Sequence, residues 1–144
     1  MCHVIEWRSW SAMSAAAAGV VRAAVDIGSG AVKLGVAEVA GGRIVRMLAD
    51  EQHVLLLARD MALNGGRAIS PAGADALVHT VRRLVDRARA LGAEHRVAGI
   101  ATAVFRAADN GAALLDRLAA EAGVRAEIIS QGGALRAVAG IRLN

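Results

Sequence analysis

The chain has 144 residues, the length of one domain or of one lobe of a larger protein, and its hydrophobic fraction of 56% argues against disorder over most of it. Its net charge of +4 comes from dispersed arginines, with only 2% aromatic residues, which argues against a nucleic-acid partner. One cysteine excludes an intrachain disulfide, and no apolar run approaches the roughly 20 residues of a membrane span. We therefore expect a cytoplasmic protein with no membrane partner.

The beginning of the chain differs from the rest. Residues 1–20 include both tryptophans and the only cysteine, and they show neither helical nor strand periodicity. We predict a poorly ordered N-terminal extension over 1–20, with Met13 as an alternative start, and one folded lobe over 21–144.

Three strands separated by turns are predicted next. Arg22–Ile27 is a short apolar run with one acid, which is typical of a buried strand. Gly28–Gly30 is a turn, and Ala31–Val39 then alternates as a half-buried strand does. A glycine hairpin leads into a third strand over Arg43–Val54. The first half is therefore predicted to be an antiparallel meander.

Helices and strands alternate in the second half. Ser70 and Pro71 are the N-cap and first residue of a long helix, which Gly92 ends. Asp109 or Asn110 caps another helix. The remaining predicted elements are strands over Arg96–Ala101 and Val124–Ile129 and a third helix over Gly133–Ile141.

The predicted order β-β-β-α-β-α-β-α is that of an RNase H-like lobe, an α/β fold found in the actin, Hsp70 and sugar-kinase superfamily. In an α/β lobe the ligand crevice lies at the carboxyl ends of the strands. Candidate site residues are therefore those that follow the predicted strands.

The first candidate segment surrounds the glycine turn. Asp26 stands near the end of the first strand, directly before Gly28-Ser29-Gly30. The glycines would let backbone N–H groups turn inward as an anion site, to which the Ser29 hydroxyl adds a donor. Asp26 would face the same crevice and coordinate Mg²⁺ through oxygen. The alternative is a tight hairpin in which Asp26 caps its own backbone.

The second candidate segment follows the fourth predicted strand. That strand runs out at Ala101 and Thr102, and the chain then delivers Arg106 before the next helix. An arginine in this place can bind phosphate oxygens bidentately. The alternative is that Arg106 pairs with Asp109 or lies on the surface, as most arginines do.

Five segments resemble, in order and spacing, the N-terminal domain of the exopolyphosphatase / guanosine pentaphosphate phosphatase (Ppx/GppA) family: Asp26–Ser29, Gly41-Gly42, Leu63–Ser70, Ala101–Gly111 and Glu127–Ser130. The resemblance implies hydrolysis of terminal phosphoanhydrides of polyphosphate or of the guanosine phosphate pppGpp, with Mg²⁺ and an attacking water. It also implies that Asp26 is the catalytic acid on the metal side and that Arg106 is the catalytic, phosphate-gripping arginine. Gly28, Ser29 and Gly30 would form the phosphate loop, although Gly30 stands where the family has asparagine.

Two departures from the family pattern bear on activity. The family's general-base glutamate follows the last strand in a Ser-Gly-x-Glu-Glu-Ala pattern, and Gly133 and Ala134 occupy the two glutamate positions here. The chain also ends at Asn144, before the family's second phosphate loop. We therefore expect a truncated or degenerate member that lacks the second lobe and is inactive alone. A homo-oligomer, or a partner chain that supplies the second lobe, is a further hypothesis.

Two other functions stay open at this point. The chain is a non-catalytic phosphate- or nucleotide-binding regulatory module, which the missing glutamates favour, or it is the first lobe of a sugar kinase or related ATPase, which the second candidate segment does not match. His53, His79 and His95 have no metal-ligand spacing and are interpreted as ordinary histidines. The sequence does not separate polyphosphate from pppGpp as the substrate.

Overall fold

The computed structural model describes residues 19–94 and 97–129, which form a five-stranded sheet with four helices. The elements in chain order are β1 (Val20–Ile27), β2 (Ala31–Ala40), β3 (Arg43–Val54), α1 (Leu57–Leu63), α2 (Pro71–Ala90), β4 (Ala98–Ala101), α3 (Ala103–Ala107), α4 (Gly111–Ala122) and β5 (Ala126–Ile128). None of the described helices is long and apolar enough to cross a membrane.

The sheet has the strand order β3-β2-β1-β4-β5. β1, β2 and β3 form the antiparallel meander, whereas β4 and β5 run parallel to β1. The parallel strands are reached through α2 and then through α3 and α4, which is the connection that parallel strands require. The predicted α/β class and RNase H-like lobe are confirmed.

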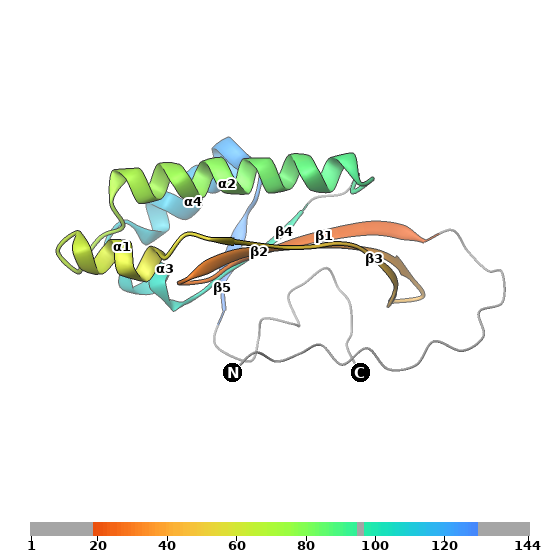
Figure 1. Ribbon diagram of the computed structural model, residues 1–144, viewed down its shortest axis with the longest axis horizontal. Helices are drawn as coiled ribbons and strands as arrows, with labels where there is room; N and C mark the ends of the chain where they lie inside the picture. Colours follow the sequence, from red (N-terminus) through yellow and green to blue (C-terminus); the bar gives the residue numbers. More distant parts are fainter. Residues whose placement is uncertain (1–18, 95–96, 130–144) are drawn as a thin grey trace.

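The helices α2 and α4 lie together on one face of the sheet (Figure 1). In β1 the alternate residues Ala23, Val25 and Ile27 are buried, as the period of two in a strand requires for a covered face. Leu77 and Val81 of α2 are fully buried, so the core lies between α2 and this face of the sheet. Asp26 has the opposite parity in β1 and therefore belongs to the other face of the sheet.

The long helix begins as its sequence predicts. The Ser70 hydroxyl accepts a hydrogen bond from the Gly73 N–H at 3.0 Å, and Pro71 occupies the first helical position, where its missing N–H has no intrahelical partner to lose. Arg87 and Arg89 lie in the last turn, where positive charge complements the helix dipole.

Five strand boundaries differ slightly from those predicted, and two helices were not predicted. β1 begins at Val20, β2 ends at Ala40, β4 begins at Ala98, and β5 runs from Ala126 to Ile128. The helices α1 and α3 have only seven and five residues, and neither N-cap residue makes a side-chain hydrogen bond. Helices this short show no apolar period, and these two carry no cap signal. The third helix predicted over 133–141 lies outside the described residues.

Candidate functional site

The carboxyl ends of the three parallel strands meet at one edge of the sheet. The Thr102 N–H donates to the Ile27 carbonyl at 3.2 Å, and the Ile129 N–H donates to the Ala101 carbonyl at 3.1 Å. These bonds tie the residues that follow β4 and β5 to the ends of β1 and β4. In Figure 1 this is the left-hand end, where α1 and α3 lie. Both predicted candidate segments therefore begin at the same edge, as an α/β crevice requires.

The glycine turn after β1 differs in detail from the prediction. The Gly28 N–H donates to the Ala31 carbonyl at 2.9 Å, so it closes the hairpin and does not point at a ligand. A Cβ on Gly28 would lie 3.0 Å from that same carbonyl oxygen, which explains the glycine by close approach. A Cβ on Gly30 would meet nothing within 4 Å, so the space beside Gly30 is open. The Ser29 and Gly30 N–H groups thus remain as candidate anion donors.

The segment between β3 and α1, together with the start of α1, is hydrogen-bonded to the carbonyl groups of the glycine turn. Ala58 N–H donates to the Ser29 carbonyl at 3.0 Å, and the Leu55 and Leu56 N–H groups donate to the Gly30 carbonyl at 3.0 and 2.9 Å. In a planar trans peptide the N–H points opposite to the preceding C=O. The Ser29 carbonyl points toward α1, so the Gly30 N–H points away from α1. These hydrogen bonds therefore fix the direction of the peptide that would bind an anion.

Asp26 lies half-buried on the face of the sheet opposite to α2 and α4. Burial raises the pKa of its carboxyl above the ordinary 3.8, and the charge of Lys33, its cross-strand neighbour on β2, partly offsets the rise. Within residues 19–94 and 97–129 no group donates a hydrogen bond to this carboxylate, so the alternative in which Asp26 caps its own backbone is not seen there. The carboxylate is a desolvated acceptor whose oxygens stay available to a cation.

Thr102 is a site candidate that the sequence analysis did not single out. Its hydroxyl oxygen is buried and has no hydrogen-bond partner in the described part of the chain. Most buried polar side-chain atoms in proteins have a partner, and an exception calls for a functional explanation. The position was readable as the first residue after a strand end, but the burial of its hydroxyl depends on the packing of the folded chain.

Arg106 lies on α3, four residues beyond Thr102, and its side chain is exposed. The alternative in which Arg106 pairs with Asp109 is wrong, because Asp109 Oδ2 accepts a 2.9 Å hydrogen bond from Arg67 Nε. Among the described residues Arg106 makes no ion pair, and the structure records no contact between it and Asp26. Its helix starts at the crevice edge, and its side chain faces solvent.

Several residues of the resembling segments have structural roles. The Asn110 side chain accepts from the Ile69 N–H at 3.0 Å and donates to the Ile69 carbonyl at 2.8 Å. Asp60 accepts from both the N–H and the hydroxyl of Ser70, at 2.7 and 2.6 Å. Together these bonds fasten the connection between α1 and α2 to the α3–α4 connection, and so hold α3 in place beside the crevice.

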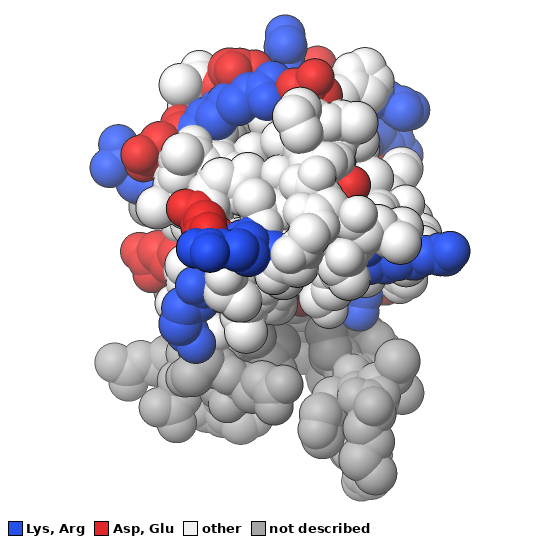
Figure 2. All heavy atoms as spheres, turned by 90° about the vertical axis from the view of Figure 1, so that its left-hand side faces the viewer, with Lys and Arg blue, Asp and Glu red and all other residues white. Residues whose placement is uncertain are grey.

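The surface around the crevice carries little charge. Figure 2 looks at the end of the molecule where α1 and α3 lie, and its described part is mainly uncharged, with blue and red side chains at the margins and an adjoining blue and red group within the face. No group of three metal-ligating side chains lies within the described residues. The positions Gly133 and Ala134, where the family glutamates are absent, lie outside the described residues.

Solved structures of Ppx/GppA proteins share this fold. The type II variant of the Aquifex aeolicus Ppx/GppA phosphatase matches with a TM-score of 0.67 and 22% identity, covering 76% of this chain and 35% of that one. Another structure of the Aquifex aeolicus PPX-GPPA enzyme matches with a TM-score of 0.68 and 21% identity, covering 78% and 36%. An exopolyphosphatase from Cytophaga hutchinsonii matches with a TM-score of 0.66 and 20% identity, covering 76% and 34%.

The chain thus spans about a third of the length of the solved structures that it matches. No protein-family model matches the sequence, and no curated protein matches it. At these identities the likeness establishes the fold and leaves the chemistry to be argued from the site.

Proposed function

We propose that the chain is the phosphate-binding lobe of a Ppx/GppA-type phosphohydrolase that acts on the terminal phosphoanhydrides of polyphosphate or pppGpp. The observation that carries the proposal is the buried hydroxyl of Thr102, directly after β4, which has no hydrogen-bond partner among the described residues. The Thr102 backbone N–H is bonded to the Ile27 carbonyl, just before the glycine turn. Leaving such a donor unpaired costs about 1–3 kcal/mol. A phosphate oxygen that accepts from Thr102 would remove this penalty once the side chain rotates to expose the hydroxyl, whose oxygen is buried in this structure. The substrate class in this proposal is taken from the exopolyphosphatase that shares the fold.

Each candidate residue has a role that its surroundings allow. Thr102, the Ser29 hydroxyl and the Gly30 N–H would donate to phosphate oxygens, and the space beside Gly30 leaves room for one. Arg106 would balance the charge of the polyphosphate, for which an exposed guanidinium with no ion pair among the described residues is suited. These donors orient the terminal phosphoryl group for in-line attack.

Asp26 fits a Mg²⁺ site of the open kind, in which one or two carboxylates, water and substrate phosphates share the ion. Its desolvated carboxylate has no donor among the described residues, so a cation would satisfy an acceptor that is otherwise unpaired. When bound, Mg²⁺ would supply charge neutralisation on the phosphoryl oxygens. Lys33 lies opposite Asp26 and would add to the positive potential at the same place.

The general base must come from outside the residues that build this crevice. Gly133 and Ala134 carry no carboxylate in the place where the family has its glutamates. We therefore propose that the chain by itself binds phosphate chains and does not release phosphate. The same two positions favour, as a second candidate, a regulatory module that binds phosphate or nucleotide without turnover.

The test is calorimetric titration of the purified chain with tripolyphosphate and with pppGpp, both with Mg²⁺. We expect Thr102→Val and Arg106→Ala each to weaken binding about tenfold, the scale of one hydrogen bond to a charged group. Arg125→Ala is the matched control, because Arg125 is exposed and precedes β5, at the opposite end of the parallel strands. The preferred ligand identifies the substrate.

A chain that binds neither ligand would overturn the proposal. A phosphate-release assay on the same samples tests the second part, and we expect no release. Release by the unmodified chain would show that another carboxylate acts as the base.

A further inference from the structure

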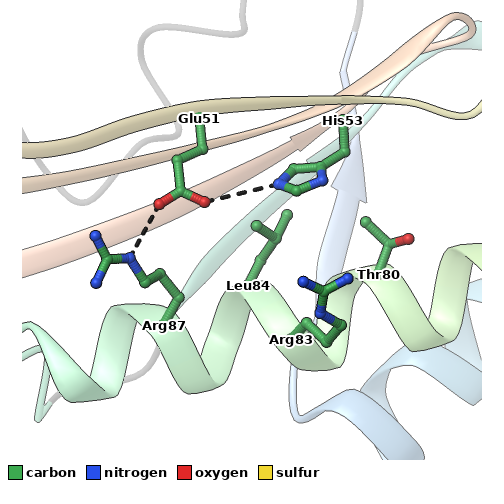
Figure 3. A pocket seen from close by; sticks show the side chains of 6 residues that line it. All are labelled: Glu51, His53, Thr80, Arg83, Leu84 and Arg87. Atoms are coloured by element: carbon green, nitrogen blue, oxygen red, sulfur yellow. Dashed lines mark hydrogen bonds and ion pairs between the residues drawn. The ribbon is translucent and has the colours of Figure 1, made fainter.

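A cavity, separate from the strand ends that carry Asp26 and Thr102, lies between the edge strand β3 and the helix α2 (Figure 3). Its volume is about 240 Å³. At about 30 Å³ per water molecule that is room for roughly eight waters, enough for one small hydrated ion and less than a drug-sized ligand requires. The lining residues are Glu51 and His53 from β3 and Thr80, Arg83, Leu84 and Arg87 from α2.

This cavity, called the groove below, and the crevice lie on opposite faces of the sheet. Glu51 is in register with Leu34, which is buried on the face covered by α2. Asp26 is in register with Lys33, whose side chain has the opposite parity in β2. A ligand in the groove therefore contacts none of the residues assigned above to the phosphate crevice.

The one acidic side chain in the groove is already engaged. Glu51 Oε1 accepts a 3.0 Å hydrogen bond from Arg87 Nε, and Glu51 Oε2 lies 3.6 Å from His53 Nε2. The hydrogen bond from Arg87 holds the pKa of the Glu51 carboxyl below its ordinary 4.5, with His53 adding to the effect. The negative charge of Glu51 is thus offset within the groove by Arg87.

Arg83 leaves the groove with a net positive charge. Among the described residues it forms no ion pair, whereas Arg87 is paired with Glu51. Thr80 and Arg83 lie three residues apart on one face of α2, and Figure 3 shows both side chains rising from the helix on the side that faces His53. Leu84, 2% exposed, lies between the two elements and keeps water from one side of the space.

We propose that this groove binds a single phosphate group through the guanidinium of Arg83, the hydroxyl of Thr80 and the His53 ring nitrogen that does not face Glu51. Three donors from two elements approach from different directions, which suits a tetrahedral oxyanion better than a planar carboxylate. The guanidinium is the side chain best matched to phosphate oxygens. The site stands independently of the function proposed for the crevice.

Amide chemical shifts of the isotope-labelled full chain, titrated with inorganic phosphate at constant ionic strength, test this proposal. We expect saturable shifts at residues 51–53 and 80–87. Arg83→Ala should weaken this binding about tenfold, the loss expected for one charge-assisted contact. Arg82→Ala is the control, because Arg82 is the neighbouring exposed arginine and does not line the groove. It should change the affinity less than about twofold.

Two further samples sharpen the test. Thr102→Val should leave the shifts at 80–87 unchanged, so that the groove and the crevice can fail separately. Acetate should bind the groove more weakly than phosphate does, and equal or tighter binding of acetate would overturn the choice of phosphate.

The groove proposal is overturned if residues 80–87 of the unmodified chain show no saturable shift, whatever the variants do. It is also overturned if Arg82→Ala and Arg83→Ala weaken binding equally, since that indicates unspecific attraction to a basic helix. Should Arg83→Ala fail to fold, Arg83→Gln and Thr80→Val take its place in the same comparison.

Discussion

The N–H of Leu56 donates a 2.9 Å hydrogen bond to the carbonyl oxygen of Gly30, which also accepts from Leu55 at 3.0 Å. Leu56 itself has the left-handed conformation, with φ 54° and ψ 47°, directly before the helix α1. Among the residues that the structure describes, Leu56 is the only non-glycine residue with a positive φ. This conformation costs a leucine roughly 1–2 kcal/mol. The segment that holds the glycine turn thus contains one strained residue, Leu56.

Relief of that strain is the first prediction. Leu56→Gly should leave the free energy of unfolding unchanged or raise it by up to about 1 kcal/mol, because glycine adopts positive φ freely and Leu56 is 43% exposed. Leu56→Pro should lower it by about 3 kcal/mol or more, because proline lacks the N–H and cannot take this φ. Urea unfolding of both variants measures the difference. A glycine variant much less stable than the parent would show that the Leu56 side chain outweighs the strain.

The second prediction concerns the pH dependence that Asp26 confers. Its folded pKa is raised above 3.8, so its contribution to stability is fully present below 3.8 and is lost as the pH rises through the folded value. Asp26→Asn should therefore be more stable than the parent at pH 7, by less than about 1 kcal/mol for a half-buried group, and this advantage should shrink as the pH falls. Thermal melts from pH 3 to 7 measure it. The exposed Asp50→Asn on β3 is the control, and an equal gain from it would show that the burial of Asp26 is not the cause.

A third prediction separates stability from binding at Thr102. Thr102→Val keeps the shape and removes the unpaired hydroxyl, so it should raise the free energy of unfolding by about 1 kcal/mol while weakening phosphate binding. Thr102→Ser restores the hydroxyl and should recover binding. Chemical denaturation and titration of the same two samples decide the matter. If Thr102→Val lost stability and kept its affinity, the hydroxyl would have a structural partner and no ligand.

The fourth prediction concerns Gly111. A Cβ at this position would collide with the carbonyl oxygen of Phe105, which belongs to the helix α3. Gly111→Ala should therefore lower the free energy of unfolding by about 3 kcal/mol through overpacking. Gly35→Ala is the control, because a Cβ there meets nothing within 4 Å. If Gly111→Ala and Gly35→Ala had the same melting temperature, the α3–α4 connection would have to shift to accept a Cβ, contrary to what its hydrogen bonds indicate.

The sequence predicts the sheet and the long helix well because their signals are local. Alternating burial gives β2 and β3, and a serine cap with proline gives the start of α2 at Pro71. The helices α1 and α3 escape prediction because they are held by tertiary contacts. The helix α1 depends on a segment distant in sequence, because the Ala58 N–H donates to the Ser29 carbonyl. The helix α3 depends on close packing, because its Phe105 carbonyl lies against Gly111.

The candidate site is predicted in part, for a similar reason. Asp26 and the glycine turn lie at a strand end that periodicity locates, and the structure puts them at the crevice edge. The reason for Gly28 is different from the predicted one, since the contact with Ala31 could not be read from the sequence. The charges of Glu51 and Arg87 lie 36 residues apart, so their pairing and the groove beside it emerge only from the packing of α2 on the sheet.

The hydrogen bond between Thr102 and Ile27 joins two stretches of chain that are far apart in the sequence, because β2, β3, α1 and α2 lie between them. The bond can form only when β4 has paired with β1. Closing so long a loop is slow and entropically costly, so we expect these strand ends to come together late in folding. A ligand bound there stabilises only the completed molecule, by about 2.7 kcal/mol at a hundredfold excess over its Kd. A phosphate ligand bound at this site would thus lower the population of unfolded chain, which is the form that proteases and chaperones recognise.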